Sequence, residues 1–153
     1  MDDIFQLAFS FTIRWEGNDK YTNDPVDPGG ETKYGISKRA YPDVDIKSLT
    51  LTEAQQIYYN DYWLKAGCDK MDNTDLAIVV FDSAVNCGVG RVKSWLAELN
   101  EKGVMEEERK SRWLLQRRIQ YYKTIVEKKP AFQKFLKGWF NRTNDLSKYI
   151  DIV

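Results

Sequence analysis

Residues 76–88 have the sequence LAIVVFDSAVNCG, which is apolar on nearly every side of a helix. A helix of this kind is stable when other elements cover it all round. Asn73 or Thr74 can cap its first turn. Its polar exceptions, Asp82 and Asn86, are four residues apart and therefore lie on one face. The segment predicts a buried central helix, around which a mainly α fold is built.

Helical patterns continue on both sides of this segment. Apolar residues recur at helical spacing, and we expect Thr52 and Gln55 to form a capping box ahead of the second helix. Pro130 closes the longest helix, and Gly138 is a point where the last one can break. The predicted helices are residues 1–15, 53–67, 90–101, 106–128 and 131–150.

The segment after the first helix is rich in residues that end helices. Residues 17–35, GNDKYTNDPVDPGGETKYG, contain four glycines and two prolines. Such a stretch predicts a long ordered loop or a small hairpin. Long loops in compact domains tend to be functional. Gly17 is placed to end the first helix, which puts Glu16 on its last turn.

The overall composition narrows the classes of function. Hydrophobic residues make up 42% and charged residues 30% of the chain, as in a globular domain. Lys plus Arg (23) balance Asp plus Glu (23), so no global positive field favours nucleic acid. The absence of His excludes Ser-His-Asp and Cys-His catalysis and His-ligated metals. Acid–base chemistry therefore falls to Asp, Glu, Lys or Tyr.

Carboxylates at the end of the first helix and in the following loop suit glycoside hydrolysis. That reaction needs a protonated carboxylic acid and a second carboxylate. A negative charge at a helix C-terminus opposes the macrodipole, and Trp15 and Tyr21 can desolvate Glu16, so its protonated form is favoured. Asp24 and Asp27 follow 8 and 11 positions later. The alternative is that each Asp, standing before a proline, only caps its own turn.

Three ordered blocks of the chain resemble one known family. They are EG at 16–17 with YTNDPVDPGGETKYGIS at 21–37, FDSAVNCG at 81–88, and GWFNR at 138–142. These blocks are similar to the motifs of glycoside hydrolase family 108, the N-acetylmuramidases found as phage endolysins and in bacterial protein-secretion loci. The matching blocks extend over nearly the whole chain.

The resemblance implies a lysozyme-like helical domain that hydrolyses the β-1,4 bond between N-acetylmuramic acid and N-acetylglucosamine, with Glu16 as general acid. Related lysozymes pair this residue with an Asp and a Thr of the following loop. These would be Asp27 and Thr32 here, with Asp24 as second choice. The chain has two extra residues directly after the Glu-Gly pair, so the identity of the second carboxylate stays open.

The resemblance also divides the chain into two regions that we expect to pack as one compact unit. Residues 1–88 would be the lysozyme-like catalytic region, and residues 89–153 a helical region that resembles a peptidoglycan-binding region. The residues expected to bind substrate are Tyr21, Tyr34, Asp82 and Asn86. For the last two, the alternative is a polar pair that satisfies buried backbone groups.

Two further segments are assigned structural roles. We expect Trp139 and Arg142 to clamp the last helix onto the core. Residues 106–118, EEERKSRWLLQRR, are expected to be a solvated helix face with i,i+4 ion pairs, because their charges largely cancel.

Two other functions remain open. A lytic transglycosylase also uses a helix-borne Glu but dispenses with the second carboxylate, because a hydroxyl of the sugar itself attacks. A non-catalytic peptidoglycan-binding or secretion-accessory module would keep the fold without the chemistry. Asp24, Asp27 and Thr32 favour hydrolysis over transglycosylation, and Glu16 favours an enzyme over a binding module.

The expected partner is bacterial peptidoglycan, bound by a monomer without metal or cofactor. We expect no binding to nucleic acid and no stable insertion into membranes. Residues 1–15 carry acids where a secretory signal needs basic residues. The expectation is synthesis in the bacterial cytoplasm, export through a holin or a secretion system, and action in the periplasm or cell wall.

Overall fold

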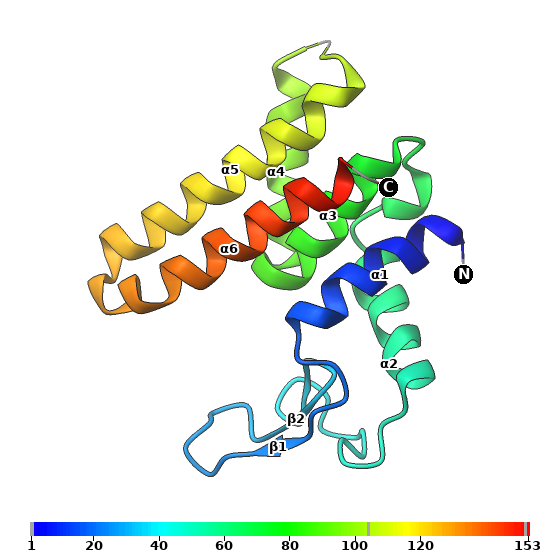
Figure 1. Cartoon of the computed structure of the whole chain (residues 1–153), viewed down its shortest axis with the longest axis vertical. Coiled ribbons are helices and arrows are strands. Elements are labelled where there is room, and N and C mark those ends of the chain that lie inside the picture. The colour runs from blue at the N-terminus through cyan, green and yellow to red at the C-terminus, as the bar shows by residue number, and fades with distance from the viewer. Residues whose placement is uncertain (1, 104, 152) are drawn as a thin grey trace.

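The computed structural model describes residues 2–103, 105–151 and 153, which form a helical body with a small β-lobe beside it (Figure 1). In chain order the elements are α1 (Asp3–Trp15), β1 (Thr22–Asn23), β2 (Glu31–Lys33), β3 (Ile36–Ser37), α2 (Leu51–Tyr58), the π-helical η1 (Tyr59–Leu64), the short η2 (Cys68–Lys70), α3 (Thr74–Cys87), α4 (Val89–Glu101), α5 (Glu107–Lys128), the short η3 (Pro130–Phe132) and α6 (Gln133–Ile150). The predicted mainly α class is confirmed, and the arrangement is consistent with a lysozyme-like fold.

Helix α3 is the centre of the body, as its composition predicts. Every residue from Leu76 to Ala84 is buried, and α1, α4, α5 and α6 all pack against the helix. Asn73 caps its start, because its side-chain oxygen accepts from the backbone N–H of Leu76 at 2.8 Å. The positions of these other helices are therefore set by their packing against α3.

Aromatic rings fix α1 against the core. Phe5 meets the rings of Tyr59, Trp63 and Phe81 edge-on, with centroid distances of 5.0, 5.5 and 5.7 Å. Edge-to-face contacts of this kind are favourable beyond the area that they bury. Since α1 is held at this depth, its C-terminal end has a fixed position beside the β-lobe.

The segment after α1 takes the hairpin form of the two predicted alternatives. It is a three-stranded antiparallel sheet in the order β1-β2-β3, in which Thr32 is opposite both Thr22 and Ser37. Tyr34 and Gly35 connect β2 to β3 with φ angles of 53° and 73°. Two successive residues with positive φ match the twist of a tight hairpin.

The start of α2 corrects a predicted cap. The capping box is formed by Thr50 and Glu53, and Thr52 lies inside the first turn. The Thr50 hydroxyl accepts from the backbone N–H of Glu53 at 3.2 Å, and the Glu53 carboxylate accepts from the backbone N–H of Thr50 at 2.8 Å. Both pairs, Thr50 with Glu53 and Thr52 with Gln55, have a spacing of three, so spacing alone could not choose between them.

Helix α6 continues through Gly138, so the predicted break there is wrong. The position faces open space, since nothing lies within 4 Å of where a Cβ would be. A glycine in a helix interior costs only about 0.5–1 kcal/mol relative to alanine. The next residue, Trp139, stacks on Tyr122 of α5 with ring centroids 5.0 Å apart. The helix is therefore continuous across the glycine and packs against α5 directly after it.

The charged run at residues 106–118 is only partly the solvated face that its composition predicts. Arg109 pairs with Glu106 and Lys110 with Glu107 near its exposed start. Arg118 is completely buried, which corrects the expectation for that residue. A buried arginine needs a carboxylate partner, and a sequence pattern cannot reveal a partner from another helix.

None of the helices in the described parts of the chain is both long and apolar enough to cross a bilayer.

Candidate active site

Glu16 stands at the point where the helical body meets the β-lobe. It is the C-cap of α1, one residue beyond the predicted last turn, and its backbone N–H donates to Thr12 O at 3.1 Å. Gly17 (φ 94°) and Asn18 (φ 49°) then reverse the chain in left-handed conformations. The side chain of Glu16 is 22% exposed, so the carboxylate is accessible while its surroundings hold it.

The two oxygens of the Glu16 carboxylate face different neighbours. Oε1 accepts from Nη1 of Arg142 at 2.7 Å. Oε2 lies against the β2–β3 turn, because a Cβ built on Gly35 would be 2.8 Å from it and 2.5 Å from the hydroxyl of Tyr58. That hydroxyl donates to the carbonyl of Tyr34 at 2.7 Å, which fixes the turn beside the carboxylate.

The buried Tyr58 and the half-buried Tyr62 add apolar surroundings to this carboxylate. Burial, followed by the charge of Glu16, raises the pKa of Tyr58 well above its usual value and raises that of Tyr62 as well. Both hydroxyls are therefore neutral at working pH. The predicted neighbours lie elsewhere: Trp15 is 37% exposed and donates to Asp145, and Tyr21 donates to Glu31.

Behind Arg142 lies a buried ionic cluster. Asp82 of α3 is fully buried and accepts from Nε and Nη2 of Arg142 at 3.2 and 2.8 Å, and from Nη1 of Arg118 at 2.7 Å. The Thr12 hydroxyl supplies a further hydrogen bond at 2.9 Å. Burial alone would raise the pKa of Asp82, but Arg142 and Arg118 outweigh it and lower that pKa to about 2.

The two candidate carboxylates of the hairpin, Asp24 and Asp27, are engaged in their own turns. Asp24 accepts from the backbone N–H of Val26 at 2.9 Å, and Asp27 accepts from that of Gly29 at 2.8 Å. Both residues are exposed. The turn-capping interpretation therefore describes their ground-state geometry, and a catalytic role for either one stays a prediction.

The remaining hairpin candidates surround β2. Thr32 is on the central strand, and its hydroxyl has only a long contact of 3.5 Å with Gly30 O. Tyr34 is in the β2–β3 turn next to the Glu16 carboxylate, whereas Tyr21 lies before β1 with its hydroxyl on Glu31. Of the predicted substrate-binding residues, Tyr34 has its backbone in the turn beside Glu16, but its side chain lines a separate hollow with Phe9 and Leu51.

Asp82 and Asn86 do not line an open groove. Asp82 is inside the arginine cluster, and Asn86 accepts a short hydrogen bond from the hydroxyl of Tyr122 on α5. Their common face of α3 is turned toward α5 and α6. Their contact with substrate stays a prediction. In the structure their side chains join α3 to α5 and α6.

Arg142, Gly35, Tyr58 and Tyr62 lie near Glu16 but were not among the predicted site residues. Arg142 was expected only to clamp α6 onto the core, which it does through Asp82; its contact with Glu16 is additional. Gly35 and Tyr58 were not singled out. The GWFNR block was the available signal for Arg142, and a Tyr-Gly pair next to a strand was the signal for Gly35.

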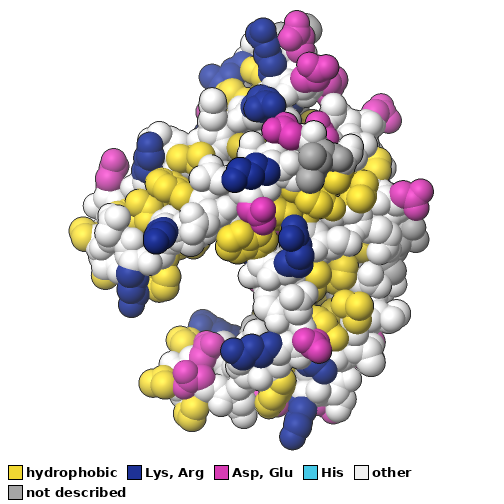
Figure 2. All heavy atoms as spheres, viewed as in Figure 1, with side chains coloured by type: hydrophobic (Ala, Val, Ile, Leu, Met, Phe, Trp, Pro, Cys, Tyr) yellow, Lys and Arg dark blue, Asp and Glu magenta, His cyan; other side chains and the backbone are white. Residues whose placement is uncertain are grey.

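The surface is hollowed between the helical body and the β-lobe. Figure 2 shows an open concavity between the β-lobe and the arm formed by the distal parts of α5 and α6. In Figure 1, α1 ends beside this space and leads directly into the lobe. The concavity is open along its length, as an extended ligand requires.

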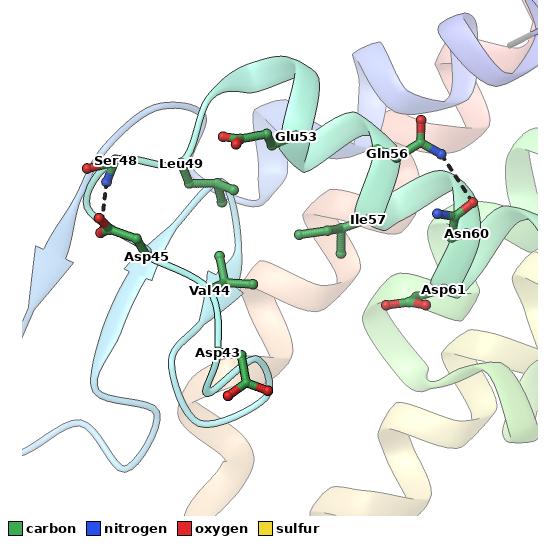
Figure 3. A pocket seen from close by; sticks show the side chains of 10 residues that line it. All are labelled: Asp43, Val44, Asp45, Ser48, Leu49, Glu53, Gln56, Ile57, Asn60 and Asp61. Atoms are coloured by element: carbon green, nitrogen blue, oxygen red, sulfur yellow. Dashed lines mark hydrogen bonds between the residues drawn. The ribbon is translucent and has the colours of Figure 1, made fainter.

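A separate pocket of about 510 Å³ lies between residues 43–49 and the helices α2 and η1 (Figure 3). Its walls carry acidic side chains around an apolar floor, but three of these carboxylates already serve local structure. Asp45 accepts from Ser48, Glu53 completes the capping box, and Asp61 accepts from Tyr41. None of the predicted site residues lines this pocket. In the described part of the chain, no group of three or more Cys, Asp or Glu side chains is placed to hold a metal ion.

The fold is shared with a solved bacterial protein. SagA from Brucella abortus superposes with a TM-score of 0.75 at 25% sequence identity, over 96% of this chain and 94% of SagA. No curated protein sequence matches the chain.

Residues 9–88 match the family model described as glycosyl hydrolase 108. This range covers more than half of the chain and contains Glu16, the sheet, α2, and α3 with Asp82. Arg142 lies outside it. The match identifies the protein as a glycoside hydrolase and supports peptidoglycan hydrolysis of the muramidase-like kind in general. The chain belongs to the glycosyl hydrolase 108 family.

Proposed function

We propose that the protein hydrolyses the β-1,4 bond between N-acetylmuramic acid and N-acetylglucosamine in peptidoglycan, with Glu16 as the general acid. The observation that carries this proposal is the position of Glu16: it directly follows α1, whose end lies beside the concavity (Figure 1), and it is 22% exposed and held by Arg142. The family match supports the class of reaction. An open concavity suits a glycan strand, which extends beyond the cleaved bond on both sides.

In this mechanism Glu16 gives its proton to the glycosidic oxygen as the bond to the anomeric carbon breaks. The leaving sugar departs as an alcohol, and the remaining ring passes through an oxocarbenium-like state. A water molecule then adds to the anomeric carbon, and its proton goes to a base. Glu16 is left ionised next to Arg142, whose positive charge stabilises the carboxylate that the step creates.

Asp27 is the first choice for the base and Asp24 the second. Either would have to leave or share its hydrogen bond with its own turn. Thr32 is suited to holding the water, because the long contact of its hydroxyl leaves that group with capacity for a stronger partner.

The same hydrogen bonds support a second candidate function, that of a lytic transglycosylase. Because the candidate carboxylates Asp24 and Asp27 are occupied by backbone N–H groups, a mechanism that uses only Glu16 and a hydroxyl of the substrate also fits. Its product would carry an anhydro-muramic end in place of a reducing end.

Mass spectrometry of digested, purified peptidoglycan tests both points. We expect fragments with reducing N-acetylmuramic acid ends. Anhydro ends would show transglycosylation, and reducing N-acetylglucosamine ends would show that the other bond is cut. Digestion in ¹⁸O-labelled water gives the matched control, since only hydrolysis places the label on the new end.

The helical region 89–153 is suited to contacting the strand away from the cleaved bond. Its arm carries a series of neighbouring rings on α5, η3 and α6, of which Phe135 is 45% exposed. The series consists of Tyr122, Trp139, Phe135 and Phe132. If the protein were a binding module without chemistry, it would bind peptidoglycan through such surfaces and leave the strands intact.

A further inference from the structure

Arg142 contacts two carboxylates from different helices with three nitrogens of one guanidinium group. Nη1 donates to Oε1 of Glu16 at 2.7 Å, while Nε and Nη2 donate to Asp82 at 3.2 and 2.8 Å. The side chain is 7% exposed. A planar group fixed at three points has little freedom to rotate.

The anchor for Arg142 is itself fixed. Asp82 also accepts from Arg118 at 2.7 Å and from Thr12 at 2.9 Å, so both of its oxygens are fully used. Arg118 in turn donates to the hydroxyl of Tyr122 at 2.7 Å. The cluster therefore joins α1, α3, α5 and α6 behind a single exposed carboxylate.

The net charge of this cluster is zero only when the carboxylate of Glu16 is included. Two arginines and Asp82 leave one positive charge uncompensated, and an ionised Glu16 balances it. A proton on Oε1 would meet the N–H of Arg142, whereas Oε2 faces the β2–β3 turn at Gly35. The two oxygens are thus not equivalent, and a proton on Oε2 avoids the N–H of Arg142 that is directed at Oε1.

We propose that Arg142 is a positioning residue for the general acid: anchored on Asp82, it holds Oε1 of Glu16 so that the transferable proton resides on Oε2. This proposal rests on the proposed function of Glu16. Arg142 lies in the GWFNR block, far from the residues of the family match, and its role makes the C-terminal helix part of the catalytic unit.

The ionisable groups packed around Glu16 come from several elements. Arg142 of α6 touches it, and Tyr58 of α2 and Tyr62 of η1 face it. The pKa of each tyrosine is raised, mainly by burial, so these two carry no charge in the working range. Asp82 and Arg118 act through Arg142. Changes at Arg142 and Asp82 should therefore move the proton equilibrium of Glu16 in opposite directions.

The test is the pH profile of the initial rate of reducing-end release from purified peptidoglycan. Its alkaline limb reports loss of the proton from the general acid. Arg142→Gln removes a cation beside Glu16 and should move this limb up by about one pH unit. Asp82→Asn removes a negative charge that compensates Arg142, so it should move the alkaline limb to lower pH. At its own optimum, Arg142→Gln should be about 10- to 100-fold slower, because Oε1 is no longer held.

Two controls separate positioning from folding. Arg112→Gln removes another arginine–carboxylate pair, with Asp151 at 3.1 Å, and should leave rate and limb unchanged. Arg142→Lys keeps the charge but loses the planar contacts, so its rate should fall while its limb stays near that of the wild type. Circular dichroism and melting temperatures show which variants are folded, and the ¹³C shift of the Glu16 carboxyl follows its titration where activity is too low.

Opposite shifts for Arg142→Gln and Asp82→Asn support the proposal. It is overturned if the folded variants have an unmoved limb or shift in the same direction. If Arg142→Gln does not fold, an unmoved limb in Asp82→Asn overturns it. Glu16→Gln tells the two hypotheses apart: full activity of that variant refutes the proposed function, whereas an inactive Glu16→Gln with unmoved limbs refutes only the role of Arg142.

Discussion

Gly35 is the residue with the least room for change beside Glu16. Its φ of 73° disfavours any side chain, and a Cβ would lie 2.8 Å from Oε2 of Glu16 and 2.5 Å from Oη of Tyr58. We expect Gly35→Ala to displace the carboxylate or the turn and to reduce the rate of peptidoglycan cleavage by about 100-fold. The initial rate of reducing-end release measures this.

Gly138→Ala is the matched control for that change. It adds the same methyl group where nothing lies within 4 Å, inside α6. It should leave the rate unchanged and stabilise the protein by about 0.5–1 kcal/mol. A Gly35→Ala variant as active as Gly138→Ala would contradict the close packing of the turn against Glu16.

At this scale the sequence made Glu16 the candidate acid but did not reveal the arginine that holds it. Glu16 is a candidate because a helix pattern ends there and because it stands in the Glu-Gly motif of the resemblance, and its catalytic role stays a prediction. Arg142 is 126 positions away, and only the folded chain brings its guanidinium to Oε1. A local sequence pattern does not reveal a contact between residues so far apart in the chain. The sequence also does not decide which residue supplies the second carboxylate, because Asp24 and Asp27 lie in the same loop and each is bound within its own turn.

At the scale of elements, the start of α2 gives a direct comparison of two caps. Thr50 accepts from the backbone of Glu53 and completes the capping box, whereas Thr52 is an exposed residue of the first turn. Thr50→Ala should cost about 1 kcal/mol of unfolding free energy, and Thr52→Ala less than about 0.5 kcal/mol. Urea denaturation of the two variants measures these losses. A larger loss of stability in Thr52→Ala than in Thr50→Ala would place the cap at Thr52.

The elements that the sequence predicted well are those with a strong local signal. The apolar run of α3 predicts a buried helix almost alone, and the breakers of residues 17–35 limit that segment to a long ordered loop or a small hairpin. The failures at Thr52, Gly138 and Arg118 have a common cause. In each case packing from another part of the chain, or a competing cap of equal spacing, decided a detail that local propensity left undecided.

At the scale of the whole molecule, the Asp82 cluster ties four helices together and should govern acid stability. Asp82 has a pKa of about 2 in the folded state against 3.8 for a free side chain. As pH falls, the unfolded chain binds this proton first. The stabilisation is therefore fully present above about pH 4 and is lost between about pH 4 and pH 2, amounting to about 2 kcal/mol.

Urea unfolding between pH 2 and pH 5 measures that contribution. The wild type should lose stability steeply as pH falls through this window, and Asp82→Asn should be less stable at pH 5 but lose less on acidification. Carboxylates outside the cluster are common to both proteins, so the difference between the two curves reports the cluster. Parallel pH curves for the two would show that Asp82 does not carry the acid sensitivity.

The central claim is that Glu16 is the general acid, and it is tested most directly by the rate at which Glu16→Gln clears purified peptidoglycan. The amide is nearly isosteric but cannot donate a proton to the leaving oxygen, so we predict a loss of at least about 100-fold with an unchanged melting temperature. Glu101→Gln, at the exposed end of α4, is the control and should clear at the wild-type rate. Equal clearing by Glu16→Gln and the wild type would contradict the account.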